Sequence, residues 1–263
     1  MKILCLGDVV GRPGRNFLSS QLADFRVLHC IDLVVANGEN AAGGSGITAK
    51  TANELSTAKV DGITLGDHVW DQKNFTNEID DLSFVCRPAN LPSSNPGKDR
   101  LILEYQGMKV GVFTVLGRSF MGPKVSCPFS TASRLIEELK NKVDSIIVEI
   151  HAETTSEKES IGWYLDGKVS LVFGTHTHVP TADGRILPGG TAYQTDLGMT
   201  GPRESVLGRD IDACVGRFLD GMPRKCAVAE GDVGLQGCVL EINPNDPRLP
   251  VSFDRVEWRE ETA

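Results

Sequence analysis

The segment Val169-Ser-Leu-Val-Phe-Gly-Thr-His-Thr-His178 joins a short apolar run to two histidines that are one residue apart. Residues 169–173 are mostly β-branched or apolar and predict a buried strand, which the following Gly-Thr ends. His176 and His178 then lie at the carboxyl end of that strand, and side chains two residues apart share a face of extended backbone. The chain contains five histidines. Two of them behind one core strand indicate a metal or catalytic site, with an exposed polar loop as the simpler alternative.

The composition describes a globular chain without a general basic face. Its 263 residues carry a formal charge of −8, and the isoelectric point is about 5.2. These values argue against a broad positive surface for nucleic acids or membranes. The length suits one large α/β domain over residues 1–263. The first residues predict a strand and a polar loop instead of the apolar stretch of a signal peptide. No apolar run approaches the length of about 18 residues that a membrane-spanning helix needs. We therefore expect a soluble, cytoplasmic protein.

The seven cysteines are scattered along the chain and form no Cys-x-x-Cys pair. An odd and dispersed set predicts neither a disulfide framework nor a zinc knuckle. We therefore expect most of them to be small, buried, hydrophobic side chains.

Polar groups also follow other predicted strands, at the end where open α/β sheets place their chemistry. These strands are predicted over residues 2–6, 31–36, 62–65 and 145–150. The groups that follow them, together with the two histidines above, are Asp8, Glu39, Asn40, Asp67, His68, His151, His176 and His178. His29, at the end of a predicted helix, is the one histidine outside this set.

The remaining segments predict helices and further strands, as in an α/β protein. Helices are predicted over residues 15–29, 49–59, 128–143 and 210–220, with Thr48 and Ser130 as the caps of the second and third. Strands are predicted over residues 84–86, 237–242 and 251–256. Residues 101–105 and 109–115 flank a Gln-Gly-Met turn and predict a hairpin, so a mixed sheet is expected. The glycines at 11 and 14 fit neither common phosphate-loop spacing, which leaves a nucleotide-binding loop as a weak alternative.

The collected polar groups combine carboxylate, amide and imidazole ligands without a thiolate. This mixture suits Mn, Fe or Zn in an octahedral site better than a structural zinc site, and Mg is a further option. The set is larger than one ion needs. Two ions about 3.5–4 Å apart that share a carboxylate would use it. The alternative is that each polar group serves its own loop.

The order of these motifs resembles the calcineurin-like metallophosphoesterases. The strings GDVVGRPGR, NGENAAGG, HAETTSEK, GTHTHVPTAD and GGTAYQTD are similar to the bacterial YmdB-like branch, and the likeness spans nearly the whole chain. The resemblance implies two mixed β-sheets packed as a sandwich and flanked by helices, in four αββα layers. It also implies a phosphodiesterase with a dinuclear iron or manganese centre that hydrolyses cyclic nucleotides, above all 2′,3′-cyclic nucleotides.

The resemblance further implies roles for single residues. One metal falls to Asp8, Glu39, Asn40 and His178, and the other to the bridging Glu39 with Asp67, His151 and His176. A hydroxide between the metals would attack the phosphorus, and His68 would protonate the leaving group. Two positions depart from the wider superfamily: Val10 stands where a histidine is usual, and Asp67 stands where an asparagine is usual. An ionised Asp67 would lower the net charge of the centre and tighten metal binding.

Substrate contacts and partners are less sharply indicated by the sequence. Arg118 and Lys158, both expected in loops, are candidates for binding a phosphate, and each could instead be a solvated surface charge. We expect a small phosphodiester as the partner, and a homo-oligomer stays open. A different class of function is a metal- or nucleotide-sensing module that acts through a protein partner. The occupied ligand positions and the donor His68 favour the enzyme.

Overall fold

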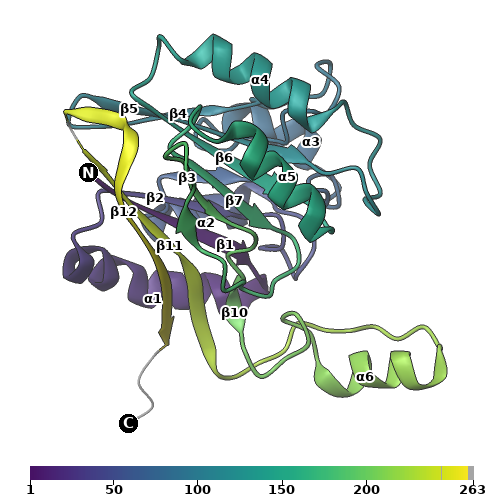
Figure 1. The fold of residues 1–263 in the computed structure, drawn as a ribbon. Helices are drawn as coiled ribbons and strands as arrows, with labels where there is room; N and C mark the ends of the chain where they lie inside the picture. Colours follow the sequence, from purple (N-terminus) through teal and green to yellow (C-terminus); the bar gives the residue numbers. More distant parts are fainter. Residues whose placement is uncertain (244, 260–263) are drawn as a thin grey trace.

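Two six-stranded sheets stack face to face in the computed structural model, which describes residues 1–243 and 245–259. Helices cover the outer faces of both sheets (Figure 1). Each sheet contains parallel and antiparallel neighbours. The predicted α/β fold with two mixed sheets flanked by helices is therefore confirmed.

The first sheet has the strand order β12-β11-β10-β1-β2-β3. Its strands are β1 (Lys2–Val9), β2 (Leu33–Asn37), β3 (Gly62–Thr64), β10 (Met199–Pro202), β11 (Val233–Asn243) and β12 (Asp246–Arg259). β1, β2 and β3 are parallel, and β10 runs parallel to the end of β1. β11 pairs antiparallel with both β1 and β12. The parallel strands of this sheet therefore end on one edge, beside β10.

The second sheet has the strand order β4-β5-β6-β7-β9-β8. Its strands are β4 (Leu101–Tyr105), β5 (Met108–Leu116), β6 (Ser145–His151), β7 (Leu171–Thr175), β8 (Arg185–Ile186) and β9 (Ala192–Gln194). β5, β6, β7 and β9 are parallel, whereas β4 and β8 are antiparallel to their neighbours. The β4–β5 pair is the hairpin that the sequence predicts.

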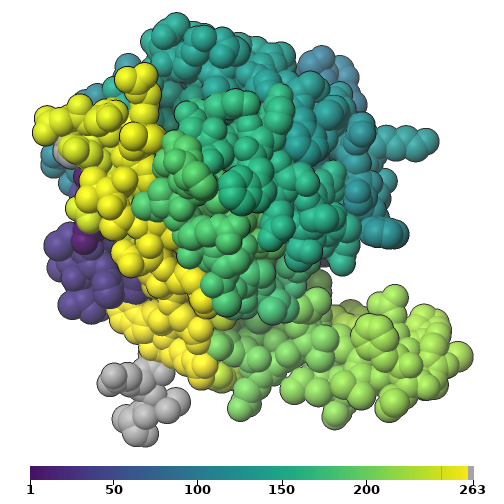
Figure 2. All heavy atoms as spheres, in the orientation of Figure 1, coloured from purple at the N-terminus to yellow at the C-terminus, as the bar shows by residue number. Residues whose placement is uncertain are grey.

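The helices are α1 (Gly11–His29), α2 (Ala49–Thr57), α3 (Phe75–Glu78), the 3₁₀ turn η1 (Ile79–Asp81), α4 (Pro128–Leu139), α5 (Thr155–Leu165) and α6 (Ile211–Asp220). α1 lies along the first sheet, and α4 and α5 lie over the second (Figure 1). α6 stands away from the body on an arm formed by residues 203–232, between β10 and β11, as Figure 2 also shows. No helix among the described residues is both long and apolar enough to cross a membrane.

Strand alternation divides the apolar side chains of β1 between two cores. Leu4 and Leu6 belong to the core beneath α1 and α2. Ile3 and Cys5 belong to the core between the sheets, where they join residues of β7 such as Phe173. Both cores are buried at close to zero exposure, and this burial provides the main stabilisation of the sandwich.

Several local predictions differ from the structure. α1 begins four residues earlier than predicted, and α5 is a helix that the sequence analysis does not predict. α4 begins at Pro128, so Ser130 is not its cap; the Ser130 hydroxyl donates to the Cys127 carbonyl from inside the first turn. Residues 84–86 do not form the predicted strand. Val85 makes an isolated bridge with Ile63, and Cys86 makes one with Lys98 in a loop.

The strand that precedes the two histidines also continues further than predicted, since Gly174 and Thr175 are part of β7. All seven cysteines lie in the described part of the chain and are free. The buried ones are Cys5, Cys86, Cys214 and Cys238. The prediction that most are buried is confirmed.

Phe173→Ala should lower the free energy of unfolding by about 3–5 kcal/mol, because it opens a cavity between the sheets. Phe173 is 1% exposed, whereas the control residue Phe218 is 86% exposed. Phe218→Ala should change the free energy by less than about 0.5 kcal/mol. Urea unfolding with a chelator present measures both variants without a metal contribution. Equal losses in the two variants would contradict this account of the core.

Candidate metal centre

The residues at the carboxyl ends of the parallel strands of the two sheets lie close together in space. β1 carries Asp8 near its end, and the turn after β2 carries Glu39. β6 ends at His151, and His176 follows β7. The backbone N–H of His176 donates to Asp8 Oδ2 at 3.0 Å, across 168 residues of sequence. The site therefore lies where the ends of both sheets meet.

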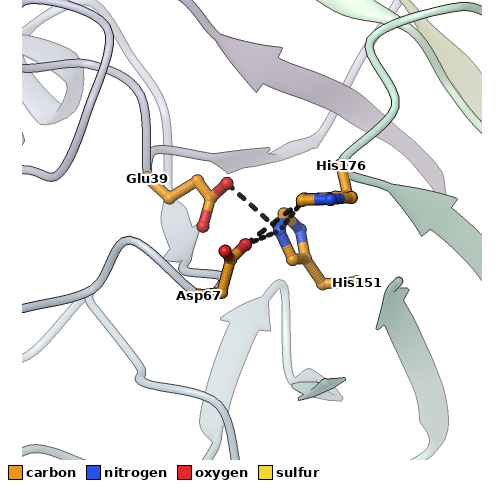
Figure 3. Close-up of side chains that lie close together, drawn as sticks. All are labelled: Glu39, Asp67, His151 and His176. Carbon is orange, nitrogen blue, oxygen red and sulfur yellow. Dashed lines mark hydrogen bonds and ion pairs between the residues drawn. The ribbon is translucent and has the colours of Figure 1, made fainter. Parts of the chain in front are cut away.

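Four side chains converge closely enough to hold one metal ion. Each of Glu39, Asp67, His151 and His176 offers a ligand atom, and these atoms lie within 4.8 Å of one another. Figure 3 shows the four side chains pointing toward a common space. His151 Nε2 lies 2.9 Å from Asp67 Oδ1 and 3.1 Å from Glu39 Oε1. His176 Nδ1 lies 3.3 Å from the same Asp67 oxygen.

A second group of ligand atoms adjoins the first. His178 Nε2 lies 3.0 Å from Asn40 Oδ1 and 3.8 Å from Asp8 Oδ1. Asp8 is fully buried, and among the described residues its Oδ1 has no hydrogen-bond partner. A buried carboxylate oxygen without a partner is costly. A cation would satisfy this oxygen, so the residues present fit a metal here.

The electrostatics of the first group favour a cation. Burial tends to raise the pKa of Asp67, but hydrogen bonds from His151 and His176 outweigh it and hold this pKa below its usual value. Burial tends to lower the pKa of His151, but the Glu39 and Asp67 carboxylates raise it well above its usual value. Negative charge thus dominates this small volume, which attracts a divalent ion.

Thr175 sets the proton position on His151. The Thr175 hydroxyl donates to Glu149 Oε1 and lies 2.8 Å from His151 Nδ1. Because its proton is used toward the carboxylate, this hydroxyl accepts from the Nδ1–H group. Nε2 is therefore the nitrogen that faces Asp67 and Glu39. It donates to these carboxylates while the ring is protonated, and after losing that proton it would offer its lone pair to a metal ion.

Glu149 and Asn37 are site residues that the sequence analysis missed. Glu149 is fully buried on β6 and accepts from Asn37 Nδ2 on β2 at 2.6 Å and from Thr114 Oγ1 on β5 at 2.8 Å. Burial raises its pKa, although the charge of His151 and the hydrogen bonds from Asn37 and Thr175 oppose the shift. The available signal was a carboxylate inside the apolar run of β6, where an acidic residue needs dedicated partners.

His68 lies beside the cluster of four, not within it. Its backbone N–H donates to Glu39 Oε2 at 3.1 Å, and its Nδ1 lies 2.8 Å from Asp71 Oδ2. Burial tends to lower the pKa of His68, but the negative charges of Glu39, Asp67 and Asp71 raise it overall. The side chain is 40% exposed and lines the same pocket as Glu39 and His176. It is therefore accessible to a bound molecule.

The structure corrects the expected position of Lys158. It lies in α5 and not in a loop, and it is fully buried, so the surface-charge alternative is wrong. Its Nζ lies 2.6 Å from Asp196 Oδ2, which also accepts from Thr177 Oγ1 at 2.6 Å. Sequence analysis did not single out Asp196. This ion pair supports the residue between His176 and His178, so Lys158 is a positioning residue.

Arg118 lies in the loop after β5 and is exposed, as expected. Its backbone N–H donates to Glu157, which fixes the loop but not the guanidinium group. Contact between Arg118 and a phosphate stays a prediction. His29 lies at the end of α1, with its ring centroid 4.2 Å from that of Phe25, far along the helix from the strand ends that form the site.

Two stacked mixed sheets with a His/Asp/Glu cluster at their strand ends define a metallophosphoesterase-like protein. The family described as YmdB-like protein matches residues 4–251. The chain belongs to this family.

Individual relatives cover nearly all of the chain. The 2′,3′-cyclic-nucleotide 2′-phosphodiesterase of Bacillus subtilis (strain 168) is 42% identical over 256 residues, which are 97% of this chain and 96% of that protein. The crystal structure of a hypothetical protein from Thermus thermophilus has a TM-score of 0.91 and 41% identity, and the match covers 99% of this chain and 100% of that one. A novel phosphatase from Mycoplasma pneumoniae has a TM-score of 0.91 and 36% identity, with 98% and 93% covered.

Thr175→Val should weaken metal binding by about 10–100-fold, because it removes the acceptor that orients His151. Thr114→Val is the matched control, since Thr114 contacts the same Glu149 carboxylate through Oε2. The control should keep an affinity close to that of the parent. Titration against a chromophoric chelator measures the affinities. Equal affinity in both variants would exclude the orienting role of Thr175.

Proposed function

We propose that this protein is a metal-dependent phosphodiesterase that hydrolyses nucleoside 2′,3′-cyclic phosphates. The supporting observation is the pairing of two adjoining ligand groups, the cluster of four and the group around Asp8 Oδ1. The printed name of the Bacillus subtilis relative supports the substrate class. The alternative is a metal- or nucleotide-sensing module without turnover.

Two ions would be shared between the ligand groups. Glu39, Asp67, His151 and His176 would hold one, and Asp8, Asn40 and His178 would hold the other together with Glu39. Oxygen and imidazole ligands suit Fe or Mn, with Zn and Mg as alternatives. Such ions, when bound, polarise phosphoryl oxygens and lower the pKa of water.

His68 would supply the proton for the leaving group. In the hydrolysis, an oxygen from water bonds to phosphorus and that water releases one proton to the solvent. The bond from phosphorus to O2′ breaks, and a proton goes from His68 to O2′. No covalent enzyme intermediate is needed. Asp71 accepts at Nδ1 of His68, 2.8 Å away, which leaves Nε2 as the nitrogen that can donate. Asp71 is not among the proposed metal ligands, so its negative charge would still favour the protonated form of His68 when the ions are bound.

The manganese-loaded protein should hydrolyse 2′,3′-cyclic nucleotides to 3′-phosphates, and a chelator should abolish this turnover. The Asp8→Ala variant should also lose this turnover, because it lacks Oδ1 of Asp8, the buried oxygen that is proposed to bind a metal. A panel of 2′,3′- and 3′,5′-cyclic nucleotides with each base, separated by chromatography, identifies the substrates. Bis(p-nitrophenyl) phosphate serves as a diester without a ribose. A fully metallated protein that cleaves none of these compounds would contradict the proposal and favour the sensing module.

His68→Ala should keep its metal and lose about 10²–10⁴-fold in kcat, which is the usual contribution of general acid catalysis. His29→Ala is the control, since His29 packs on Phe25 outside the site. It should keep the parental kcat. Metal content and steady-state rates are measured on the same preparations. If His68→Ala is metallated and turns over at the parental rate, His68 is not the proton donor.

A further inference from the structure

A pocket of about 660 Å³ extends from the metal-ligand groups to the arm that carries α6. One wall consists of ligand side chains and His68. The other wall comes from the arm, with Leu207, Arg217, Phe218 and Arg224 among its residues. The arm projects beside the body in Figure 1 and Figure 2. A molecule in this pocket would therefore touch the proposed metal centre at one end and the arm at the other.

The base of the arm is tied to the ligand loops. The Leu207 carbonyl lies 3.0 Å from His178 Nδ1. The Arg209 guanidinium donates to the carbonyl oxygens of Gly43 and Gly44, in the turn that follows Asn40. These contacts fix the arm relative to the centre, so its side chains can take part in binding.

The two arginines on the arm differ in their charge partners. Arg224 makes two hydrogen bonds to the carboxylate of Asp220, which neutralise its charge. Arg217 is exposed on α6, and no carboxylate of a described residue pairs with it. Arg217 thus presents a free guanidinium to a pocket whose opposite wall carries Glu39 and the histidines of the site. In a chain with a formal charge of −8, this positive group can select an anion.

The same wall offers apolar surface. Leu207 and Phe218 line the pocket, and Phe218 is 86% exposed. An aromatic ring without a packing partner suits stacking against a nucleobase. The wall therefore combines the two contacts that recognise a nucleotide, a base-stacking surface and a phosphate-binding guanidinium.

The proposed reaction places the substrate in this pocket. His68 must reach O2′, so the ribose lies on the side of the centre that His68 lines. The cyclic phosphate joins O2′ and O3′ on one edge of the ribose, and C5′ lies on the other edge. The 5′ substituent then points away from the metal ligands, toward the arm.

We infer, on the basis of the proposed function, that Arg217 binds a phosphate on O5′ and that the preferred substrate is a 5′-phosphorylated nucleoside 2′,3′-cyclic phosphate. Arg217 is then a specificity-determining residue of the same site. A guanidinium–phosphate contact should favour this substrate over the 5′-hydroxyl form on the order of tenfold.

The test compares pairs of ligands that differ only at O5′. Adenosine 3′,5′-bisphosphate and adenosine 3′-monophosphate, which resemble the products, are titrated into the manganese-loaded protein by calorimetry. The corresponding cyclic substrates are compared by kcat/KM. The wild-type protein should prefer the 5′-phosphorylated member of each pair. Arg217→Gln should bring both ratios close to one, and Arg255→Gln, an exposed arginine of β12 outside the pocket, should retain the wild-type ratios.

Equal binding of the two nucleotides by the wild-type protein would overturn the inference. So would an Arg217→Gln variant that keeps the preference. Because Arg217 is exposed, the Arg217→Gln variant should fold like the wild-type protein. Matching thermal unfolding curves would verify this. Failure of the proposed function has a different signature, which is a metallated protein that cleaves no diester. In that case the ratio of the affinities for the two adenosine nucleotides still tests the role of Arg217.

Discussion

A buried carboxylate, Glu149, connects the two sheets directly behind the proposed metal ligands. It accepts from Asn37 on β2, at 2.6 Å, and thereby joins the first sheet to β6 of the second. Thr114 and Thr175 donate to it from the strands on either side of β6. These hydrogen bonds offset the desolvation of the charged group. The position of β2 relative to β6, and with it the distance between the two halves of the site, depends on this interaction.

The ligand set is divided between the sheets. Asp8 lies in β1, and Glu39 and Asp67 follow strands of the same first sheet, whereas His151 and His176 lie in or after strands of the second. Neither sheet holds an ion by itself, so metal binding and closure of the sandwich should stabilise each other. A buried carboxylate oxygen such as Asp8 Oδ1, without a partner among the described residues, is a stability cost that this coupling can remove.

The turn that carries two of the histidines needs support from behind. His176 and His178 both have positive φ, at 94° and 61°, a region that costs energy for residues other than glycine. Thr177 between them donates its backbone N–H and its hydroxyl to Asp196, which is paired with buried Lys158. The ion pair holds the strained turn, and the imidazoles face the site as a result. The arm with α6 has no such buried network among its described residues, and its exposed side chains are free to contact a ligand.

The sequence alone determined the features that local patterns encode. Alternating apolar residues located most strands, and polar residues at strand ends located Asp8, Glu39, Asp67, His151 and His176, because parallel strands bring their ends to one edge. Contacts over long sequence separations required the tertiary structure. Lys158 looked like a loop charge until α5 placed it against Asp196, 38 residues away, and Glu149 became a bridge only when β2 packed across from β6. Burial and pairing of a charge depend on which segments meet in space, and no local pattern specifies that.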